Sequence, residues 1–263
     1  MASVADIPGG ALTDWQDIKV WRKAKRAELI ARREAVAPDE RRRWNNAITR
    51  HLEAALSVPP GSIVGFCWPF KGEFDARYAA RHWRDRGGMS ALPEVVGKGE
   101  PLQFRKWWPG APMRPGVYDI PVPVDTDVVV PDIALVPMNG YDEQCYRLGY
   151  GGGYFDRTLA KWRGGMVAIG VSYEILRLPS IHPQPHDIPM DFVVTEAGVH
   201  QAVAGKLERL DDEAAAVSMR RLLAARRLPR AAPLDEQAGF SSPACYASQF
   251  PGYWGEQHDT EKK

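Results

Sequence analysis

The fold is decided by two runs of sequence, LVPMNGYD at residues 135–142 and RLGYGGGYFDR at residues 147–157. The first run begins as an apolar strand. The second contains four glycines and leads into an amphipathic segment, for which we expect a helix from Asp156 to Arg163. Glycines let the backbone approach a ligand closely, and the unpaired N–H groups of a first helical turn attract anions. A strand, a glycine loop and a helix start in this order predict a phosphate-binding site.

Charged side chains surround the loop. Arg147 and Arg157 add positive charge, but Asp156 would repel a phosphate unless a cation lay between them, so it suggests a divalent metal. Neither common glycine motif fits: a dinucleotide fingerprint needs glycine where Tyr154 stands, and the chain has no Gly-Lys-Ser/Thr triplet of a P-loop. The residues alone also allow a tight strand-to-helix turn with Asp156 as a helix cap.

This block resembles the signature of the 5-formyltetrahydrofolate cyclo-ligase family, also called methenyltetrahydrofolate synthetases. In that family an Arg-Leu-Gly-x-Gly-x-Gly-Tyr-Tyr/Phe-Asp-Arg run follows a strand that ends in Val-Pro, and residues 147–157 match it without a gap. Further family-like segments occur in the expected order: WPFKGEFD at 68–75, YDIPVP at 118–123 and PHDIPMD at 185–191. The resemblance covers residues 15–198.

The resemblance implies an ATP-dependent conversion of 5-formyltetrahydrofolate to 5,10-methenyltetrahydrofolate, with release of ADP and phosphate. It implies Mg²⁺ held by Asp156 and Asp187, and it makes Arg147 and Asp156 the catalytic candidates. Arg22 and Arg26 come from an ungapped match of the basic helix near the N-terminus, and the other expected ATP-binding residues come from the glycine loop. The expected ATP-binding residues are Arg22, Arg26, Arg147, Leu148, Gly149, Tyr150, Gly151, Gly152, Gly153, Tyr154 and Phe155.

The substrate side of the site is expected from the other matching segments. Glu73 matches the family's substrate-side glutamate, and a carboxylate there can accept hydrogen bonds from the pterin's N–H groups. Trp68 and Tyr118 offer flat faces for an aromatic ring, and Tyr150 and Tyr154 could line the same side of the loop. For Glu73 an exposed turn carboxylate is the alternative, and Trp68 could simply be a core residue at a strand end.

Composition bounds the class of protein. The chain has 263 residues, 44% hydrophobic and 25% charged, and its net charge of +1 gives no case for a nucleic-acid partner. Its three cysteines, Cys67, Cys145 and Cys245, are far apart and odd in number, so they predict neither a disulfide framework nor a zinc site. No apolar run approaches the roughly 18 residues of a membrane helix, and the N-terminus lacks a signal pattern. We therefore expect a cytoplasmic protein without a membrane partner.

Strands and helices alternate along the chain. Apolar runs at residues 63–68, 133–136 and 166–171 read as buried strands, and helical patterns lie between them. This order predicts the α/β class, as a three-layer sandwich with a mostly parallel sheet covered by helices on both faces. Residues 97–115 read as irregular.

Two units are expected along the chain. A cyclo-ligase-like α/β domain would span residues 14–204, and a C-terminal extension of unknown role would span 205–263. In the extension we expect one helix at 207–227. The aromatic tail at 240–254 could pack on the surface or bind an unknown partner.

Two alternatives to the cyclo-ligase stay open at this stage. A diverged relative could keep the ATP site and act on another substrate. A non-catalytic protein could bind folate or nucleotide and recruit a partner through its tail. Asp156, Asp187 and Glu73 occurring together favour catalysis over mere binding.

Overall fold

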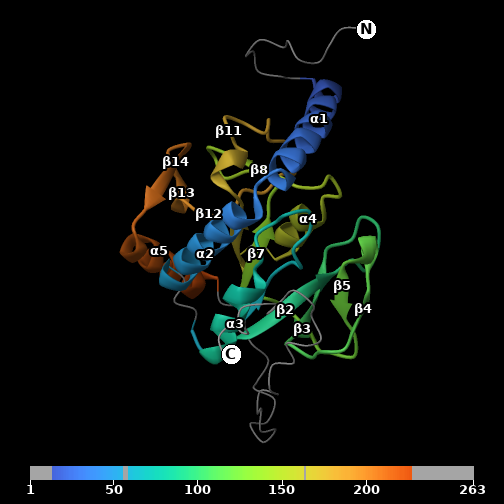
Figure 1. Cartoon of the computed structure of the whole chain (residues 1–263), viewed down its shortest axis with the longest axis vertical. Coiled ribbons are helices and arrows are strands. Elements are labelled where there is room, and N and C mark those ends of the chain that lie inside the picture. The colour runs from blue at the N-terminus through green and yellow to red at the C-terminus, as the bar shows by residue number, and fades with distance from the viewer. Residues whose placement is uncertain (1–13, 56–58, 163, 227–263) are drawn as a thin grey trace, which may run out of the picture.

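A nine-stranded sheet runs through the molecule (Figure 1). The computed structural model describes residues 14–55, 59–162 and 164–226. The strands, from edge to edge, are β14 (Lys206–Leu210), β13 (Gly198–Val203), β12 (Phe192–Thr195), β10 (Val167–Val171), β7 (Ile133–Pro137), β1 (Ile63–Gly65), β2 (Met89–Glu94), β3 (Gln103–Trp107) and β6 (Val128–Val129).

The five central strands, from β12 to β2, are parallel. Two antiparallel strands extend the sheet at each edge, β13 and β14 on one side and β3 and β6 on the other. The carboxyl ends of the parallel strands therefore meet along one edge, where open α/β sheets bind their ligands.

Side chains alternate between two cores on either side of the sheet. Along β7, Ile133 and Leu135 enter one core, whereas Ala134 and Val136 enter the other. The first core is covered by α2 (Pro38–Ala55), α3 (Arg77–Asp85) and α5 (Asp212–Ala225), with α1 (Trp15–Glu34) adding Leu29. The second is covered by α4 (Tyr154–Lys161) through Leu159. The predicted three-layer α/β fold is confirmed.

Two small sheets and two short helical turns complete the described structure. One sheet has the order β11 (Arg177–Leu178), β8 (Gly140–Asp142) and β9 (Arg147–Leu148), and it carries the chain from β7 into the glycine loop. The other pairs β4 (Met113–Pro115) with β5 (Pro121–Pro123). The 3₁₀ turns are η1 (Val117–Asp119) and η2 (Glu174–Leu176).

Two expectations about secondary structure are wrong. The stretch at residues 97–115, expected to be irregular, contains the strands β3 and β4. The strand β3 forms by pairing with β2. The single helix expected at 207–227 is divided: Lys206–Leu210 forms β14 against β13, and α5 begins only after Asp211, whose carboxylate accepts from Ala214 N at 2.7 Å. Strand pairing overrides the local helical pattern there.

The expected domain boundary after residue 204 falls in the turn between β13 and β14. Beyond it, α5 packs on α2 and buries Ala215 and Met219. Arg226 pairs with Asp191 at 2.5 Å. Residues 206–226 thus share the core of the preceding chain, and the tail at 240–254 lies outside the described residues.

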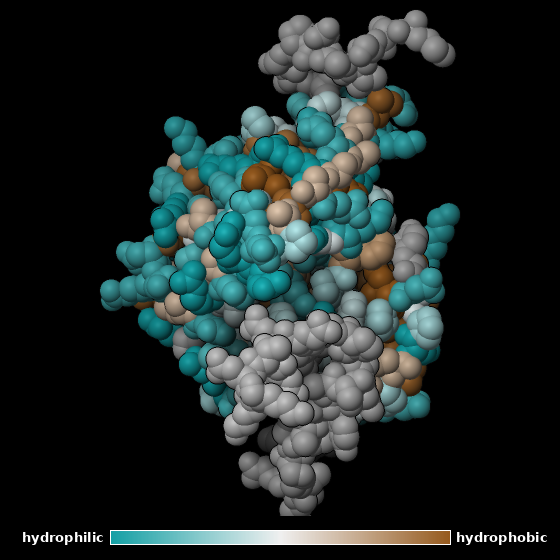
Figure 2. Space-filling model, in the orientation of Figure 1, coloured by the Kyte–Doolittle hydropathy of each residue, from teal (hydrophilic) through white to brown (hydrophobic). Residues whose placement is uncertain are grey.

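The surface in Figure 2 is mostly hydrophilic, and its hydrophobic side chains form small separate patches. Across the described ranges, no helix is long and apolar enough to cross a membrane. Cys67 and Cys145 are free thiols, and Cys245 lies outside the part that the structure describes.

We predict that Met219→Ala will lower the free energy of unfolding by about 2–5 kcal/mol, because it leaves a cavity at a fully buried position of α5. Val217→Ala on the same helix is the control: Val217 is 51% exposed, so its truncation should change stability by less than about 0.5 kcal/mol. Urea denaturation measures both. Equal, small effects would mean that α5 is not part of the cooperative unit.

Candidate active site

One face of α1 brings three arginines to the carboxyl edge of the sheet. Ile18, Arg22, Arg26, Leu29 and Arg33 recur every three or four residues, so they lie on the same side of the helix. Ile18 and Leu29 anchor this face in the protein interior. Arg22 contacts the segment that contains Asp187, whereas Arg26 and Arg33 both contact the glycine loop, and these contacts build the site.

The glycine loop contacts Arg26. Its Nε donates to Gly149 O at 2.5 Å, and a methyl group added at Gly151 would lie 3.4 Å from its guanidinium. Gly151 and Gly153 have φ of 96° and 64°, a backbone region that residues with side chains rarely adopt. Gly153 is the N-cap of α4, so the loop feeds directly into the first helical turn. Burial lowers the pKa of Arg26, and the charge of Arg22 lowers it further.

Asp156 and Arg147, which flank this loop in the sequence, form an ion pair. Arg147 Nη2 lies 2.9 Å from Asp156 Oδ2, and the Arg147 side chain is almost completely buried. Ile188 N donates to Asp156 Oδ1 at 3.2 Å, and Arg147 Nη1 donates to Ile188 O at 3.3 Å. Asp156 lies in the first turn of α4 but makes no side-chain cap, so its role is not that of a helix cap.

Asp187 is held in the same way by Arg22. Arg22 Nη2 lies 2.6 Å from Asp187 Oδ2, which also accepts from Gln184 N at 2.7 Å. Arg22 Nε donates to Ile181 O at 3.1 Å. Both carboxylates expected to bind metal are thus paired with arginine. Between residues 14 and 226, outside the gaps, no group of three His, Cys, Asp or Glu is arranged to hold a metal ion.

Glu73 is buried rather than an exposed turn residue, with 8% of its surface accessible. Its Oε1 accepts from the Tyr150 hydroxyl at 2.8 Å, and its Oε2 accepts from Phe70 N at 3.0 Å. Arg33 Nη2 donates to the same hydroxyl at 2.9 Å. Burial raises the pKa of Glu73, and Arg33 together with the two hydrogen bonds partly opposes the rise. Tyr150 therefore joins the glycine loop to the Glu73 loop.

Sequence reasoning missed Arg33. Its position on the α1 stripe with Ile18, Arg22, Arg26 and Leu29 is the signal that could have revealed it, because a basic residue at a buried helical position must have a partner. The identity of those partners was not available from the helix itself.

The remaining predicted residues lie in different surroundings. Leu148 is buried, so only its backbone can face a ligand. The Tyr154 ring packs over Gly152, and Phe155 lies beside the second core. Trp68 packs edge-on against Trp107 at 6.1 Å. Tyr118 lies in η1, and its side chain is outside the described part.

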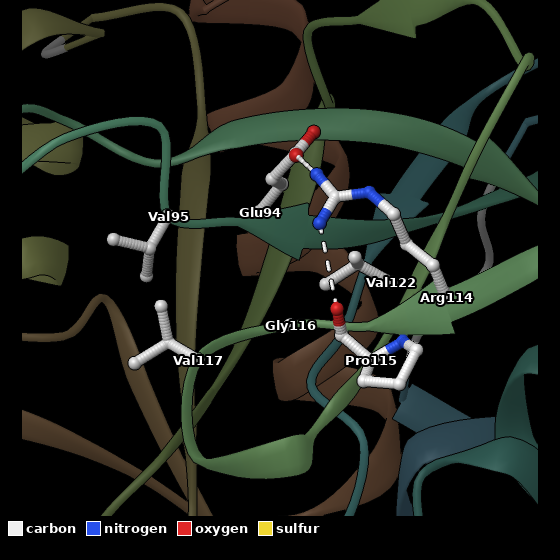
Figure 3. A pocket seen from close by; sticks show the side chains of 7 residues that line it. All are labelled: Glu94, Val95, Arg114, Pro115, Gly116, Val117 and Val122. Atoms are coloured by element: carbon white, nitrogen blue, oxygen red, sulfur yellow. Dashed lines mark hydrogen bonds and ion pairs between the residues drawn. The ribbon is translucent and has the colours of Figure 1, made fainter.

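A pocket of about 290 Å³ opens at the end of β2 (Figure 3). Its lining residues are Glu94, Val95, Arg114, Pro115, Gly116, Val117 and Val122. The carboxylate of Glu94 is paired with Arg105 and Arg114, and valines form the facing walls. None of these residues was predicted, although Tyr118 follows Val117 directly. Because β2 is parallel to β1, the pocket and the segment after β1 open at the same edge of the sheet.

Fold and site define an α/β protein in which a glycine loop lies among arginine–carboxylate pairs at the carboxyl edge of a parallel sheet. Residues 18–196 match the model of the 5-formyltetrahydrofolate cyclo-ligase family. The chain belongs to that family, which makes it an enzyme of the ligase class.

Individual relatives agree with this assignment. The 5-formyltetrahydrofolate cyclo-ligase of Escherichia coli K12 is 26% identical over 176 residues, which cover 64% of this chain and 96% of that protein. The 5-formyltetrahydrofolate cyclo-ligase of Haemophilus influenzae is 30% identical over 95 residues. These residues cover 34% of this chain and 51% of that protein. The solved 5,10-methenyltetrahydrofolate synthetase of Aquifex aeolicus has a TM-score of 0.59 at 27% identity, covering 72% of this chain and 96% of that one.

Proposed function

We propose that the protein converts 5-formyltetrahydrofolate to 5,10-methenyltetrahydrofolate, with ATP consumed to ADP and phosphate. The observation that carries this proposal is the Tyr150 side chain, which connects the glycine loop to the buried Glu73. Tyr150 belongs to a glycine loop suited to phosphate, and its hydroxyl bonds the buried Glu73, a carboxylate suited to N–H donors. A nucleotide and a donor-rich ring can therefore meet at Tyr150.

The phosphate side consists of backbone and cations. The loop from Gly149 to Gly153 is followed at once by the first turn of α4, whose free N–H groups favour negative charge. Arg26 contacts the loop backbone, and the buried Arg147 precedes the loop in sequence and pairs with Asp156. These groups can position a transferring phosphoryl group and neutralise its charge, which is most of what such catalysis requires.

Asp156 fits a Mg²⁺ ion that is bound mainly by phosphate oxygens and water, since such sites need only one or two carboxylates. Its side chain is 19% exposed and lies at the start of α4, next to the loop. Mg²⁺ would neutralise the phosphates and polarise the transferred group. Asp187 fits less well, because its side chain is only 9% exposed and Arg22 contacts both of its oxygens.

The folate side would begin at Glu73 and continue along the sheet edge. The Glu73 carboxylate can accept hydrogen bonds from the amino and ring N–H groups of a pterin. The Trp68 ring and the pocket beside Val117 lie along the same edge and offer apolar walls for the rest of the molecule.

The chemistry follows from the poor leaving ability of a formamide oxygen. That oxygen attacks the γ-phosphorus of ATP, the bond to ADP breaks, and the formyl carbon becomes electrophilic. N10 of the same folate then attacks this carbon and loses its proton, and the carbon–oxygen bond breaks to release phosphate. No side chain acts as a nucleophile, so the protein contributes position and charge.

The function is tested by following absorbance after mixing the purified protein with 5-formyltetrahydrofolate, ATP and Mg²⁺. The methenyl product is conjugated across its new ring, so absorbance at longer wavelength should grow only when all three are present. ADP should form in step with it. ADP formation without folate, or no spectral change at high enzyme concentration, would indicate a relative that acts on another substrate.

We expect Gly151→Val to weaken ATP binding about tenfold or more, because a branched side chain at φ of 96° is strained by on the order of 1–3 kcal/mol and would displace the loop. Gly99→Val is the matched control, since Gly99 has φ of 84° and no atom within 4 Å of an added methyl group. Calorimetric titration with ATP compares them. Parent-like affinity in folded Gly151→Val contradicts a phosphate role for the loop.

Asp156→Asn should reduce turnover at low Mg²⁺ and recover part of it when Mg²⁺ is raised, because the variant keeps the size of the side chain but loses its charge. It also leaves the buried Arg147 without its partner, so thermal unfolding must show that the variant is folded. Asp127→Asn, at a surface ion pair with Lys106, is the control. If no Mg²⁺ concentration restores activity, Asp156 acts only as the ion-pair partner of Arg147 and does not bind the metal.

A further inference from the structure

A buried cation links the loops on the two sides of this site. Arg33 is 1% exposed and lies on α1, seven positions after Arg26. Its Nε donates to Lys71 O at 2.8 Å, its Nη1 to Asn139 Oδ1 at 2.9 Å, and its Nη2 to the Tyr150 hydroxyl at 2.9 Å. All three nitrogens of the guanidinium are therefore used.

The three acceptors belong to three separate segments. Lys71 follows β1, Asn139 connects β7 to β8, and Tyr150 lies in the glycine loop. Since β1 and β7 are adjacent parallel strands, these segments open at the same edge of the sheet. A planar guanidinium can hold acceptors in several directions at once, whereas an ammonium group is a compact point charge.

The turn before Glu73 depends on the same side chain. Lys71 and Gly72 have φ of 48° and 73°, two successive residues in the left-handed region. Arg33 Nε bonds the Lys71 carbonyl, and a methyl group at Gly72 would lie 3.7 Å from Arg33 Cγ. The Arg33 side chain therefore contacts this turn, together with Arg41 of α2, and the turn leads directly to Glu73.

Glu73 is fixed at both oxygens. Oε1 accepts from the Tyr150 hydroxyl at 2.8 Å and lies 3.9 Å from Arg33 Nη2, while Oε2 accepts from Phe70 N at 3.0 Å. Arg33 therefore acts on Glu73 directly through charge and indirectly through Tyr150.

We propose that Arg33 is a positioning residue of this site, which holds the Glu73 carboxylate in place and sets the Glu73 loop against the glycine loop. Its effect on catalysis rests on the proposed function, but its effect on Glu73 does not, because that effect is argued only from contacts within the protein. A shift of one loop against the other would misalign the formyl oxygen and the phosphoryl group.

The charge environment of Glu73 makes the proposal measurable. Burial raises the pKa of Glu73, and Arg33 is the largest influence that lowers it. Without Arg33 the pKa rises further, so the carboxylate takes up a proton at a higher pH. Cys67, Tyr150 and Tyr173 also interact electrostatically with Glu73, and Arg41 of α2 lies beside the neighbouring Gly72.

The experiment titrates the Glu73 carboxyl by NMR in the whole protein carrying ¹³C-labelled glutamate, with Glu73→Gln identifying the signal. In Arg33→Met the proton affinity of Glu73 should rise about tenfold or more. It should stay at the parent value in Arg32→Met, which removes an exposed arginine from the same helix. In the enzyme assay, kcat/KM for folate should fall roughly ten- to a hundredfold in Arg33→Met, and the acid limb of its pH profile should move to higher pH.

Arg33→Lys separates charge from geometry. It should return the Glu73 titration close to the parent value but leave kcat/KM reduced, because an ammonium cannot hold three loops in one plane. A folded Arg33→Met with parent-like Glu73 titration overturns the proposal. If Arg33→Met does not fold, parent-like kcat/KM in Arg33→Lys overturns it instead. If the parent shows no turnover, the proposed function fails, and the NMR titration of Glu73 still decides the role of Arg33.

Discussion

The site depends on the cost of burying charge. A guanidinium or carboxylate taken out of water destabilises the fold unless it finds opposite charge and hydrogen bonds. Arg33 is almost wholly buried and satisfies its donors on three segments. Arg22 forms an ion pair with Asp187, and Arg147 forms one with Asp156. Each pair therefore fixes a loop to the scaffold.

The sheet explains why these loops meet. Five parallel strands carry their carboxyl ends to one edge, and the connections after β1, β7 and β10 all begin there. The second face of the sheet has small residues such as Ala134, Ala168 and Gly170, where even a methyl group on Gly170 would clash with Met138. Close packing at that face lets the short helix α4 approach the strands and present its first turn at the edge.

Packing also decides which charges remain available to a ligand. The Asp187 carboxylate is surrounded by donors, whereas Asp156 keeps part of its surface accessible beside the glycine loop. Among the residues that the structure describes, Arg26 bonds a backbone carbonyl and no carboxylate, so no direct partner there neutralises its positive charge. The balance of charge near the loop is thus positive at Arg26, which suits an anionic ligand.

The sequence by itself determined the local elements and the family. The buried strands at residues 63–68, 133–136 and 166–171 and the glycine loop at residues 147–157 followed from apolar runs, glycine spacing and ordered motifs, because these depend on neighbouring residues. Only the tertiary structure decided that Lys206–Leu210 forms a strand, since its ladder partner β13 overrides a helical pattern. It alone joined Arg33 to Tyr150, 117 positions away. Such contacts are set by how loops converge at a sheet edge, and no local pattern encodes that convergence.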